Sequence, residues 1–316
     1  MSTTGRSPIE NRTLVLRLRP SRRKARELAV AEVVSLLREF EASAAPGGPL
    51  SELGGVCWVT VQENYLEDAI AALALLGYTA AVDLVSSGAD SARRNPRSAR
   101  RARKPAPLTR VYEEPDESVR ASAPDRRTFL LECADGLVRA IRGYRGSRGA
   151  LAHRALPVED ARLLVNLVAA PDTRLLLDPF AGAGGVIIAA KARGFTTVSL
   201  DLDPALRFGL AQFSNWHIVG DASSLPLASA SIDMVASEPP YDASALGVLL
   251  ASIREIARVL RPGGRAAFLL ASEQAAEVRH AGTDSGLVLE IESPVNRKSV
   301  STRCQCWSRP RIARPL

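Results

Sequence analysis

Hydrophobic and polar residues alternate over residues 13–18, which is the period of a strand with one buried face. Two further segments near the start of the chain, residues 56–61 and 79–85, are also expected to be strands. Between them, apolar residues recur every three or four positions over residues 21–40 and 65–76, as in amphipathic helices. The Pro- and Gly-rich residues 44–49 are expected to break the chain. The order of elements predicts a small ferredoxin-like α/β domain over residues 10–86, which is a candidate RNA-binding domain.

The periodicity disappears over residues 87–127, where arginine, serine, proline and alanine dominate. Eight basic residues between positions 93 and 110 precede an acidic patch at residues 113–117. Few aliphatic residues and a high charge predict a disordered linker. Two interpretations of its charge stay open, namely a contact with the phosphates of a nucleic acid and a solvated tether.

From residue 128 to residue 316 the pattern changes to strands alternating with helices. The expected strands span residues 174–177, 198–200, 217–219, 234–236 and 265–270, and the expected helices span residues 186–192 and 246–260. Such alternation predicts an α/β domain with a doubly wound parallel sheet covered by helices on both faces. Two late strands, residues 287–291 and 303–307, have no helix between them and predict an antiparallel hairpin at the sheet edge.

A loop of small residues follows the first expected strand of this domain. It reads Asp178, Pro179, Phe180, Ala181, Gly182, Ala183, Gly184 and Gly185. In an open α/β sheet the ligand crevice lies at the carboxyl ends of the strands, where this loop is expected. Glycines allow the backbone to approach a ligand where a Cβ would collide. The loop alone does not identify the ligand, because dinucleotide and nucleotide sites use the same device.

Two further carboxylates end the next two strands. Asp201 precedes Leu202, and Asp221 precedes Ala222. A carboxylate at the first position can accept hydrogen bonds from ribose hydroxyls, and one at the second can accept from an adenine amine. Each acid could instead be a solvated residue or a helix cap. Three acids after three successive strands favour a ligand that contains a nucleoside.

The fourth strand is followed by Glu238, Pro239, Pro240 and Tyr241, so this tetrapeptide is expected to share the crevice. The two prolines remove N–H donors and leave carbonyl acceptors, and the tyrosine offers a flat face on which a base can stack. The structural alternative is a proline turn with a capping acid.

Both motifs resemble those of class I methyltransferases that act on nucleic-acid amino groups, which carry an Asp-Pro-Phe-x-Gly-x-Gly-Gly loop and an Asp/Asn-Pro-Pro-Tyr tetrapeptide. The resemblance implies a Rossmann-like fold and S-adenosyl-L-methionine as the cofactor. It implies that residues 182–184 lie under the methionine part, that Asp201 holds the ribose, and that Asp221 with the Ala222 backbone binds the adenine. It also implies that Glu238 and the Pro239 carbonyl accept hydrogen bonds from the target amine. Two positions depart from the pattern, because Glu238 replaces Asp or Asn and Ala183 stands where a hydroxyl residue is common.

Three other segments resemble the THUMP-associated tRNA guanine-N2 methyltransferases. These segments are residues 156–167, residues 221–226, and the ending Asn296-Arg297-Lys298 before residues 303–307. The resemblance covers residues 151–309, and only one small α/β unit precedes it instead of a full THUMP module. It implies that the enzyme methylates guanosine N2 in an RNA, most simply a tRNA, and that a paired target base is flipped out of its stem.

Four alternatives stay open. A DNA adenine- or cytosine-N-methyltransferase uses the same tetrapeptide, and a small-molecule methyltransferase shares the cofactor loop. A catalytically inactive RNA-binding protein could keep the fold, with Glu238 as its support. An NAD enzyme would also use a glycine loop and a downstream acid, but it gives no account of the Pro-Pro-Tyr motif.

The charge and the cysteines refine this picture. The net charge of +7 and the pI near 9.6 favour an acidic partner such as a nucleic acid, although an arginine-rich proteome would give the same values. A group of N-terminal arginines is expected to help hold the strand: Arg17, Arg19, Arg22 and Arg23. Cys304 and Cys306 lack zinc-ligand spacing, so they are expected to be strand residues and no metal is expected. We find neither an apolar leader after Met1 nor a membrane-length apolar run, so a cytoplasmic protein is expected.

Overall fold

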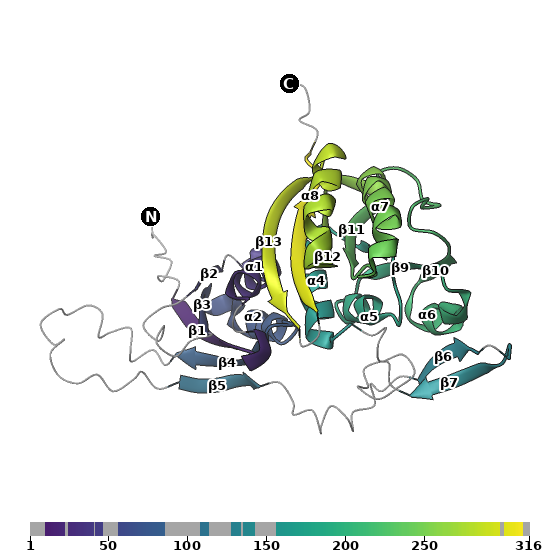
Figure 1. Cartoon of the computed structure of the whole chain (residues 1–316). Helices are drawn as coiled ribbons and strands as arrows, with labels where there is room; N and C mark the ends of the chain where they lie inside the picture. The colour runs from purple at the N-terminus through teal and green to yellow at the C-terminus, as the bar shows by residue number, and fades with distance from the viewer. Residues whose placement is uncertain are drawn as a thin grey trace, which may run out of the picture. The chain divides into compact units, whose positions relative to one another are not determined.

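The computed structural model is drawn in Figure 1. It describes residues 10–22, 25–40, 42–46, 56–85, 108–113, 128–133, 135–142, 156–297 and 300–311. The chain divides into two compact units, Met1–Glu114 and Pro115–Leu316. Of the predicted linker over residues 87–127, only residues 108–113 lie inside the described part.

The first unit is a five-stranded sheet with two helices. Its elements are β1 (Asn11–Leu18), α1 (Arg26–Leu36), β2 (Ser43–Pro46), β3 (Val56–Gln62), α2 (Leu66–Leu73), β4 (Thr79–Val85) and β5 (Leu108–Glu113), with 3-10 turns at Pro20–Arg22, Arg38–Phe40 and Glu63–Tyr65. The sheet order is β2-β3-β1-β4-β5, and each neighbouring pair is antiparallel. The first four strands have the split β-α-β arrangement of a ferredoxin-like domain, which confirms the predicted fold of this unit.

Two strands of this sheet differ from the sequence prediction. The predicted chain break at residues 44–49 overlaps β2. This strand pairs with β3 at the sheet edge and ends at a proline, where a missing N–H is tolerated. The predicted disordered linker contains β5, which pairs with β4. In β5, Val111 and Tyr112 pack against the domain core, and the Tyr112 hydroxyl donates to the Ala74 carbonyl oxygen over 3.3 Å. The linker prediction is therefore wrong for residues 108–113. Charged residues flank the few apolar ones in this segment, so its sequence pattern did not indicate a strand.

The N-terminal arginines make contacts inside the first unit. Arg17 and Arg110 both bind the buried carboxylate of Asp83. Burial alone would raise the pKa of Asp83, but the hydrogen bonds from the two arginines hold it below its usual value. Arg19 donates to the Gly77 carbonyl oxygen over 2.6 Å, and the guanidinium of Arg22 lies 5.5 Å from the centre of the Tyr78 ring. Part of the positive charge expected to face a nucleic acid is therefore bound within the domain, whereas Arg23 lies outside the described residues.

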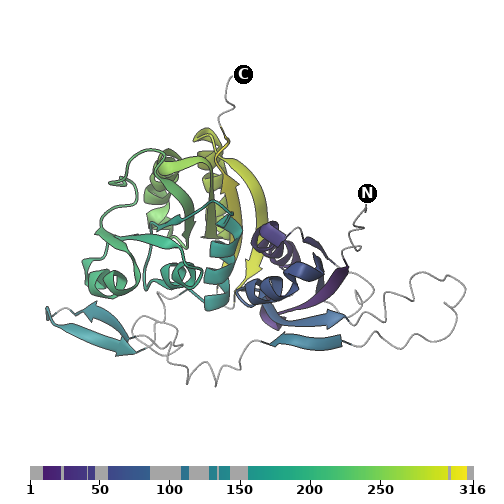
Figure 2. The same cartoon turned by 180° about the vertical axis from the view of Figure 1, so that it is seen from behind.

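The second unit contains a seven-stranded sheet, a separate hairpin and several helices (Figure 2). Its strands are β6 (Thr128–Glu132), β7 (Val138–Arg142), β8 (Leu175–Asp178), β9 (Thr196–Asp201), β10 (Trp216–Val219), β11 (Ile232–Ser237), β12 (Leu260–Ala271), β13 (Val288–Asn296) and β14 (Ser301–Ser308). Its helices are α4 (Val158–Val168), α5 (Gly185–Ala192), α6 (Arg207–Phe213), α7 (Leu246–Val259) and α8 (Ala275–Asp284), with 3-10 turns at Pro204–Leu206, Ala243–Ala245 and Ser272–Gln274.

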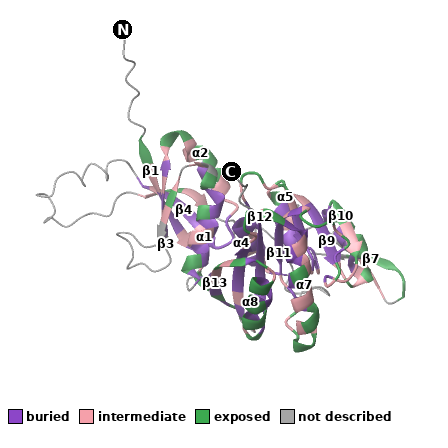
Figure 3. Ribbon diagram, turned by 90° about the horizontal axis from the view of Figure 1, so that it is seen from above, coloured by how far each residue is buried: buried purple, intermediate pink, exposed green. Residues whose placement is uncertain are grey.

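The sheet order β10-β9-β8-β11-β12-β14-β13 confirms the predicted doubly wound sheet with a terminal hairpin. The first five strands are parallel, and β14 runs antiparallel between β12 and β13. Seen from above, α4 and α5 cover one side of the sheet and α7 and α8 the other (Figure 3). The buried Cys304 and Cys306 both lie on β14, as predicted. Because the chain order reverses between β8 and β11, a ligand crevice is expected at their carboxyl ends.

The β6–β7 hairpin packs beside the start of α6. Leu131 contacts the buried cluster that includes Leu206 and Leu210, and Glu132 forms an ion pair with Arg207 at 3.3 Å. Within the described part of the chain, no helix has the length and apolar character needed to cross a membrane. The same residues contain no group of three His, Cys, Asp or Glu side chains arranged to hold a metal ion.

Candidate active site

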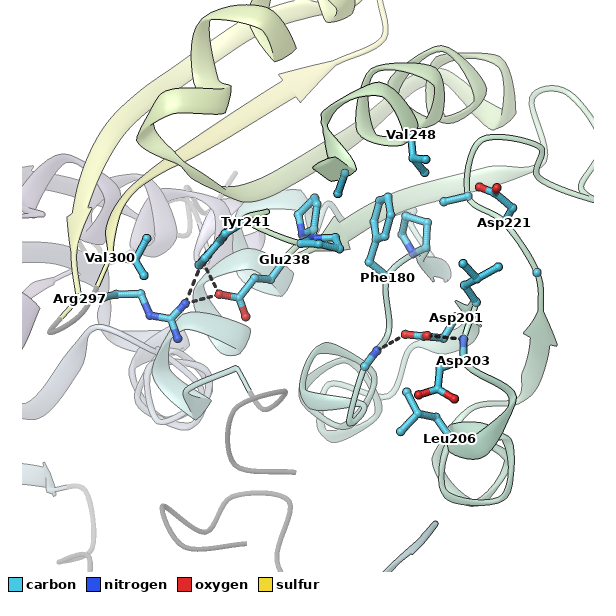
Figure 4. A pocket seen from close by; sticks show the side chains of 18 residues that line it. Phe180, Asp201, Asp203, Leu206, Asp221, Glu238, Tyr241, Val248, Arg297 and Val300 are labelled. Carbon is cyan, nitrogen blue, oxygen red and sulfur yellow. Dashed lines mark hydrogen bonds and ion pairs between the residues drawn. The ribbon is translucent and has the colours of Figure 1, made fainter. Parts of the chain in front are cut away.

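A cavity of about 910 Å³ lies at the carboxyl ends of β8, β9, β10 and β11 (Figure 4). We call the part lined by Asp201, Asp203 and Asp221 the aspartate end, and the part lined by Glu238, Tyr241 and Arg297 the glutamate end. Phe180 lies between the two ends (Figure 4). The described residues that line the cavity are Pro179, Phe180, Gly182, Asp201, Leu202, Asp203, Leu206, Gly220, Asp221, Ala222, Glu238, Pro239, Pro240, Tyr241, Ala245, Val248, Arg297 and Val300.

The glycine loop turns sharply between β8 and α5. Gly182 has a φ of 50° and Gly184 a φ of 77°, both in the left-handed region that side chains disfavour. The Gly184 N–H donates to the Ala181 carbonyl oxygen over 2.8 Å, and Gly184 is the N-cap of α5. A Cβ on Gly184 would also lie 3.4 Å from the Leu210 side chain. Gly182 therefore reaches the cavity, whereas Ala181, Ala183 and Gly184 support the loop from behind.

Asp178 is buried and does not line the cavity. Its Oδ1 accepts hydrogen bonds from the Ser237 hydroxyl at 2.6 Å and from the Phe180 N–H at 3.2 Å. Burial raises the pKa of Asp178 to about 7, and the nearby carboxylates of Asp201 and Glu238 add to the rise, whereas the two hydrogen bonds oppose it. Asp178 thus connects the glycine loop to the end of β11 instead of facing a ligand.

Asp201 is held by two backbone donors. Its Oδ2 accepts from the Gly182 N–H at 2.7 Å, and its Oδ1 accepts from the Asp203 N–H at 2.9 Å. A carboxylate oxygen has two lone pairs, so each oxygen can accept one more hydrogen bond from a ligand. The adjacent Leu202 is 69% exposed and adds an apolar surface to the same part of the lining.

Asp221 is fixed in a similar way, because its Oδ1 accepts from the Ser223 N–H at 2.8 Å. The neighbouring Ala222 is buried, and the Gly220 N–H donates to the Asp201 carbonyl oxygen over 3.0 Å. Local backbone bonds therefore orient both acids of the aspartate end. Asp203, which was not predicted as a site residue, also lines this end and accepts from the Ala205 N–H at 2.9 Å.

At the glutamate end, three side chains form one hydrogen-bonded cluster. The Glu238 Oε1 atom accepts from the Tyr241 hydroxyl and from Nη1 of Arg297. The same Nη1 donates to the Tyr241 oxygen over 2.9 Å. Burial raises the pKa of Tyr241, and the negative charge of Glu238 raises it further, so the phenol keeps its proton as a donor.

The Pro-Pro turn is held by a residue that the sequence did not indicate. The buried Gln274 donates from Nε2 to the Pro240 carbonyl oxygen over 2.9 Å, while its Oε1 accepts from the Ala271 N–H at 3.2 Å. Among the described residues, no hydrogen bond reaches the Pro239 carbonyl oxygen. The first proline carbonyl therefore has its acceptor capacity available, whereas the second carbonyl is occupied.

The predicted site residues thus separate into two groups. Asp178, Ala181, Ala183 and Gly184 lie behind the cavity wall, and the other predicted residues line the cavity. Sequence reasoning missed Arg297 as a site residue, although the Asn-Arg-Lys segment that contains it was noted. It also missed Val248, which is one position among many apolar ones on an amphipathic helix.

The cavity is acidic overall. Of the residues that the structure describes, four line it with carboxylates, Asp201, Asp203, Asp221 and Glu238, and Arg297 is the one basic side chain among them. A concentration of one sign of charge in a cleft attracts ligands of the opposite sign. This cavity is therefore suited to a ligand that carries positive charge and hydroxyl or amino donors.

Residues 177–268 match the methyltransferase domain family. A malonyl-[acyl-carrier protein] O-methyltransferase of Methylococcus capsulatus is 33% identical over 157 residues, which cover 45% of this chain and 54% of that relative. A tRNA (guanine(10)-N2)-dimethyltransferase of Pyrococcus abyssi is 33% identical over 99 residues, which cover 28% of this chain and 30% of the relative. The chain matches only part of these curated relatives, between 21% and 54% of the length of each relative.

Among solved structures, a T. thermophilus 16S rRNA N2 methyltransferase in complex with AdoMet and guanosine aligns with a TM-score of 0.39 and 21% identity. The alignment covers 60% of this chain and 47% of that one.

The second unit has the class I methyltransferase fold, with its characteristic sheet order and glycine loop, and part of it matches the methyltransferase domain family. S-adenosylmethionine is the cofactor of this domain. The observed site fits it, because the cavity offers carboxylate acceptors for hydroxyl and amino donors and a negative lining for a cationic sulfonium.

Proposed function

We propose that this protein methylates an exocyclic amino group of a nucleic-acid base. The proposed target is N2 of a guanosine in a tRNA. The observation that carries the proposal is the position of the tetrapeptide from Glu238 to Tyr241. It lines the same cavity as the aspartate end and lies on the other side of Phe180 (Figure 4).

The aspartate end would hold the cofactor. Asp201 would accept from the ribose hydroxyls, and Asp221 with the Ala222 backbone would bind the adenine. The glycine turn at Gly182 leaves room for the methionine part, because no Cβ projects there. When bound, S-adenosylmethionine supplies an electrophilic methyl group on a positively charged sulfur.

The glutamate end would bind the acceptor amine. Glu238 and the Pro239 carbonyl oxygen would each accept one N–H, which orients the nitrogen lone pair away from both acceptors and towards the cofactor. Because the leaving group is already good, positioning and charge placement account for most of the catalysis expected from the protein. The Glu238 carboxylate also favours the positive charge that develops on the nitrogen, and it can accept the proton that the nitrogen then loses.

The charge of the cavity argues for an amine in preference to a carboxylate acceptor. The relatives include an enzyme named as a methyltransferase of a malonyl group, so an O-methyl acceptor needs consideration. Among the described lining residues, four carboxylates stand against one guanidinium. This excess of negative charge would repel an anionic acceptor.

Three observations favour RNA as the substrate. The chain carries a net charge of +7, the family resemblance points to tRNA, and one group of relatives is named for tRNA guanine methylation. Tyr241 provides an aromatic ring beside the acceptor position, on which a flipped base can stack.

Incubation with methyl-labelled S-adenosylmethionine and unmodified total tRNA tests the proposal, with nucleosides separated by mass spectrometry. Label in N2-methylguanosine that disappears in Glu238→Ala is the expected result. Label in another nucleoside would replace guanosine N2 as the target. Transfer to DNA or to a malonyl thioester, but not to tRNA, would contradict the RNA substrate. Cofactor binding without transfer to any acceptor would indicate an inactive RNA-binding protein.

A further inference from the structure

Arg297 reaches the glutamate end from the chain segment that follows β13, far in sequence from the residues it contacts. Its guanidinium binds Glu238 and Tyr241 through Nη1, and its Nε lies 3.9 Å from Oδ2 of Asp160 on α4. We propose that Arg297 is a positioning residue: it holds Oε1 of Glu238 so that Oε2 is the oxygen presented to the acceptor amine. This inference rests on the proposed function.

The length of the glutamate side chain makes such a residue necessary. Glutamate has one methylene more than the Asp or Asn of the resembling tetrapeptides, so its carboxylate has an additional rotatable bond. An unrestrained glutamate would lose that freedom only when the acceptor binds, at a cost in conformational entropy. Because two donors already hold Oε1, most of this freedom is removed before the acceptor arrives.

The cluster leaves one acceptor oxygen for the substrate. Both donors, the Tyr241 hydroxyl and the Arg297 guanidinium, bind Oε1. Within the described part of the chain, no hydrogen bond reaches Oε2 of Glu238. The carboxylate therefore has a side occupied by the protein and a side available to an N–H donor.

Arg297 is itself held firmly. Its side chain is 20% exposed, and that of Asp160 is 1% exposed. Burial would lower the pKa of Arg297, but the charges of Glu238 and Asp160 and the hydrogen bond to Glu238 raise it, so the guanidinium stays charged. A planar guanidinium can bind several acceptors at fixed angles, which an ammonium group cannot do.

The charge balance of the cluster is compatible with an amine acceptor. Arg297 pairs with Glu238, and the carboxylates of Asp201, Asp203 and Asp221 line the same cavity. Arg297 thus fixes the geometry of Glu238, while the described lining keeps more negative than positive side chains, which favours a nitrogen as it becomes cationic.

A double-mutant cycle tests this role, with kcat and KM measured for the wild type, Arg297→Met, Glu238→Asp and the double variant. Arg297→Met is expected to lower kcat about ten- to hundredfold, since a displacement near 1 Å at a reacting centre costs about that much. The Kd of S-adenosylmethionine should change less than twofold. In Glu238→Asp the shorter side chain no longer needs Arg297, so the same Met substitution should cost less than about threefold.

Two further variants make the cycle decisive. Arg297→Lys keeps the charge but loses the planar fork, and it should lie between wild type and Arg297→Met in kcat. Arg303→Met removes an arginine of the same hairpin that pairs with Glu292 at 3.1 Å, and it should leave kcat unchanged. Equal losses for Arg297→Met in the Glu and Asp backgrounds, or a loss confined to cofactor binding, would overturn the positioning role.

The acceptor used in the cycle is the one that the wild type methylates. If that acceptor is DNA instead of tRNA, the proposed substrate fails, and a kcat loss for Arg297→Met that depends on Glu238 still supports the positioning role. If the wild type transfers no methyl group to any nucleic acid, both proposals are overturned.

Discussion

The two ends of the cavity are built in different ways. At the aspartate end, Asp201 and Asp221 are oriented by backbone N–H groups that lie close to them in sequence or on the adjoining loop. At the glutamate end, the side chain of Glu238 is oriented by other side chains, and the turn behind it is held by Gln274.

This difference bears on the proposed separation of binding from chemistry. Backbone donors tolerate most substitutions nearby, so the aspartate end is suited to the cofactor-binding role that we propose for it. A side-chain cluster depends on each of its members, so single substitutions at the glutamate end are expected to act on the proposed acceptor site.

The largest effect is expected for Glu238→Ala. This substitution removes one of the two proposed acceptors for the amine, and kcat should fall about a thousandfold. The Kd of S-adenosylmethionine should stay within about twofold of wild type, as measured by isothermal titration. Glu277→Ala on α8, an exposed glutamate, serves as the control. A large loss of cofactor affinity in Glu238→Ala would contradict the proposal that the two ends have separate roles.

Asp201→Asn should act on the other end. The substitution removes a charged acceptor, and hydrogen bonds to charged groups are worth about 1.5–3 kcal/mol, so the Kd of S-adenosylmethionine should rise about ten- to hundredfold. Asp284→Asn, at the end of α8, should leave this Kd unchanged. An unchanged Kd in Asp201→Asn would place the cofactor elsewhere.

The raised pKa of Asp178 predicts that the stability of the folded chain depends on pH. Its pKa is about 7 in the folded chain and 3.8 in the reference state, so the folded chain binds the extra proton between these values and stability falls as the pH rises through that range. Asp178→Asn keeps an oxygen for Ser237 and Phe180 without the buried charge. Urea unfolding should show the variant more stable than wild type at pH 8, by at least about 1 kcal/mol, and the gap should close near pH 3. A gap of equal size at both values would contradict an ionisable origin.

The smallest effect is expected for Gln274→Met. Loss of the bond to the Pro240 carbonyl oxygen should cost about 1 kcal/mol, which corresponds to about a fivefold fall in kcat through a loosened Pro-Pro turn. Gln212→Met on α6 removes a glutamine that donates to the Phe208 carbonyl oxygen over 3.3 Å, and it is the matched control. If both variants lose the same activity, the turn does not depend on Gln274.

The sequence indicated Asp201 and Asp221 as residues of the aspartate end because a strand, an acid and a turn follow one another along the chain at both positions. The same pattern at Asp178 gave a buried residue behind the cavity wall, because the pattern does not tell which side chain faces the cavity. The glutamate end was predicted only in part, because Arg297 and Gln274 reach it through tertiary structure, Arg297 from the position after β13 and Gln274 from the 3-10 turn after β12.

A similar limit applies to the first unit. The alternating strands β1, β3 and β4 were predicted, and their antiparallel order fits the ferredoxin-like pattern. The short edge strands β2 and β5 were missed, because β2 contains a proline and β5 lies among charged residues. Edge strands bury little surface, so their apolar pattern is weak.

Single-turnover methyl transfer at saturating labelled S-adenosylmethionine tests the separation of the two ends most directly. The comparison uses wild type, Asp201→Asn and Glu238→Ala, with unmodified tRNA as the acceptor. The account predicts that saturation restores the transfer rate of Asp201→Asn to near that of wild type and leaves Glu238→Ala about a thousandfold slower. Recovery of Glu238→Ala at saturating cofactor, or persistent failure of Asp201→Asn, would contradict the assignment of binding to one end and chemistry to the other.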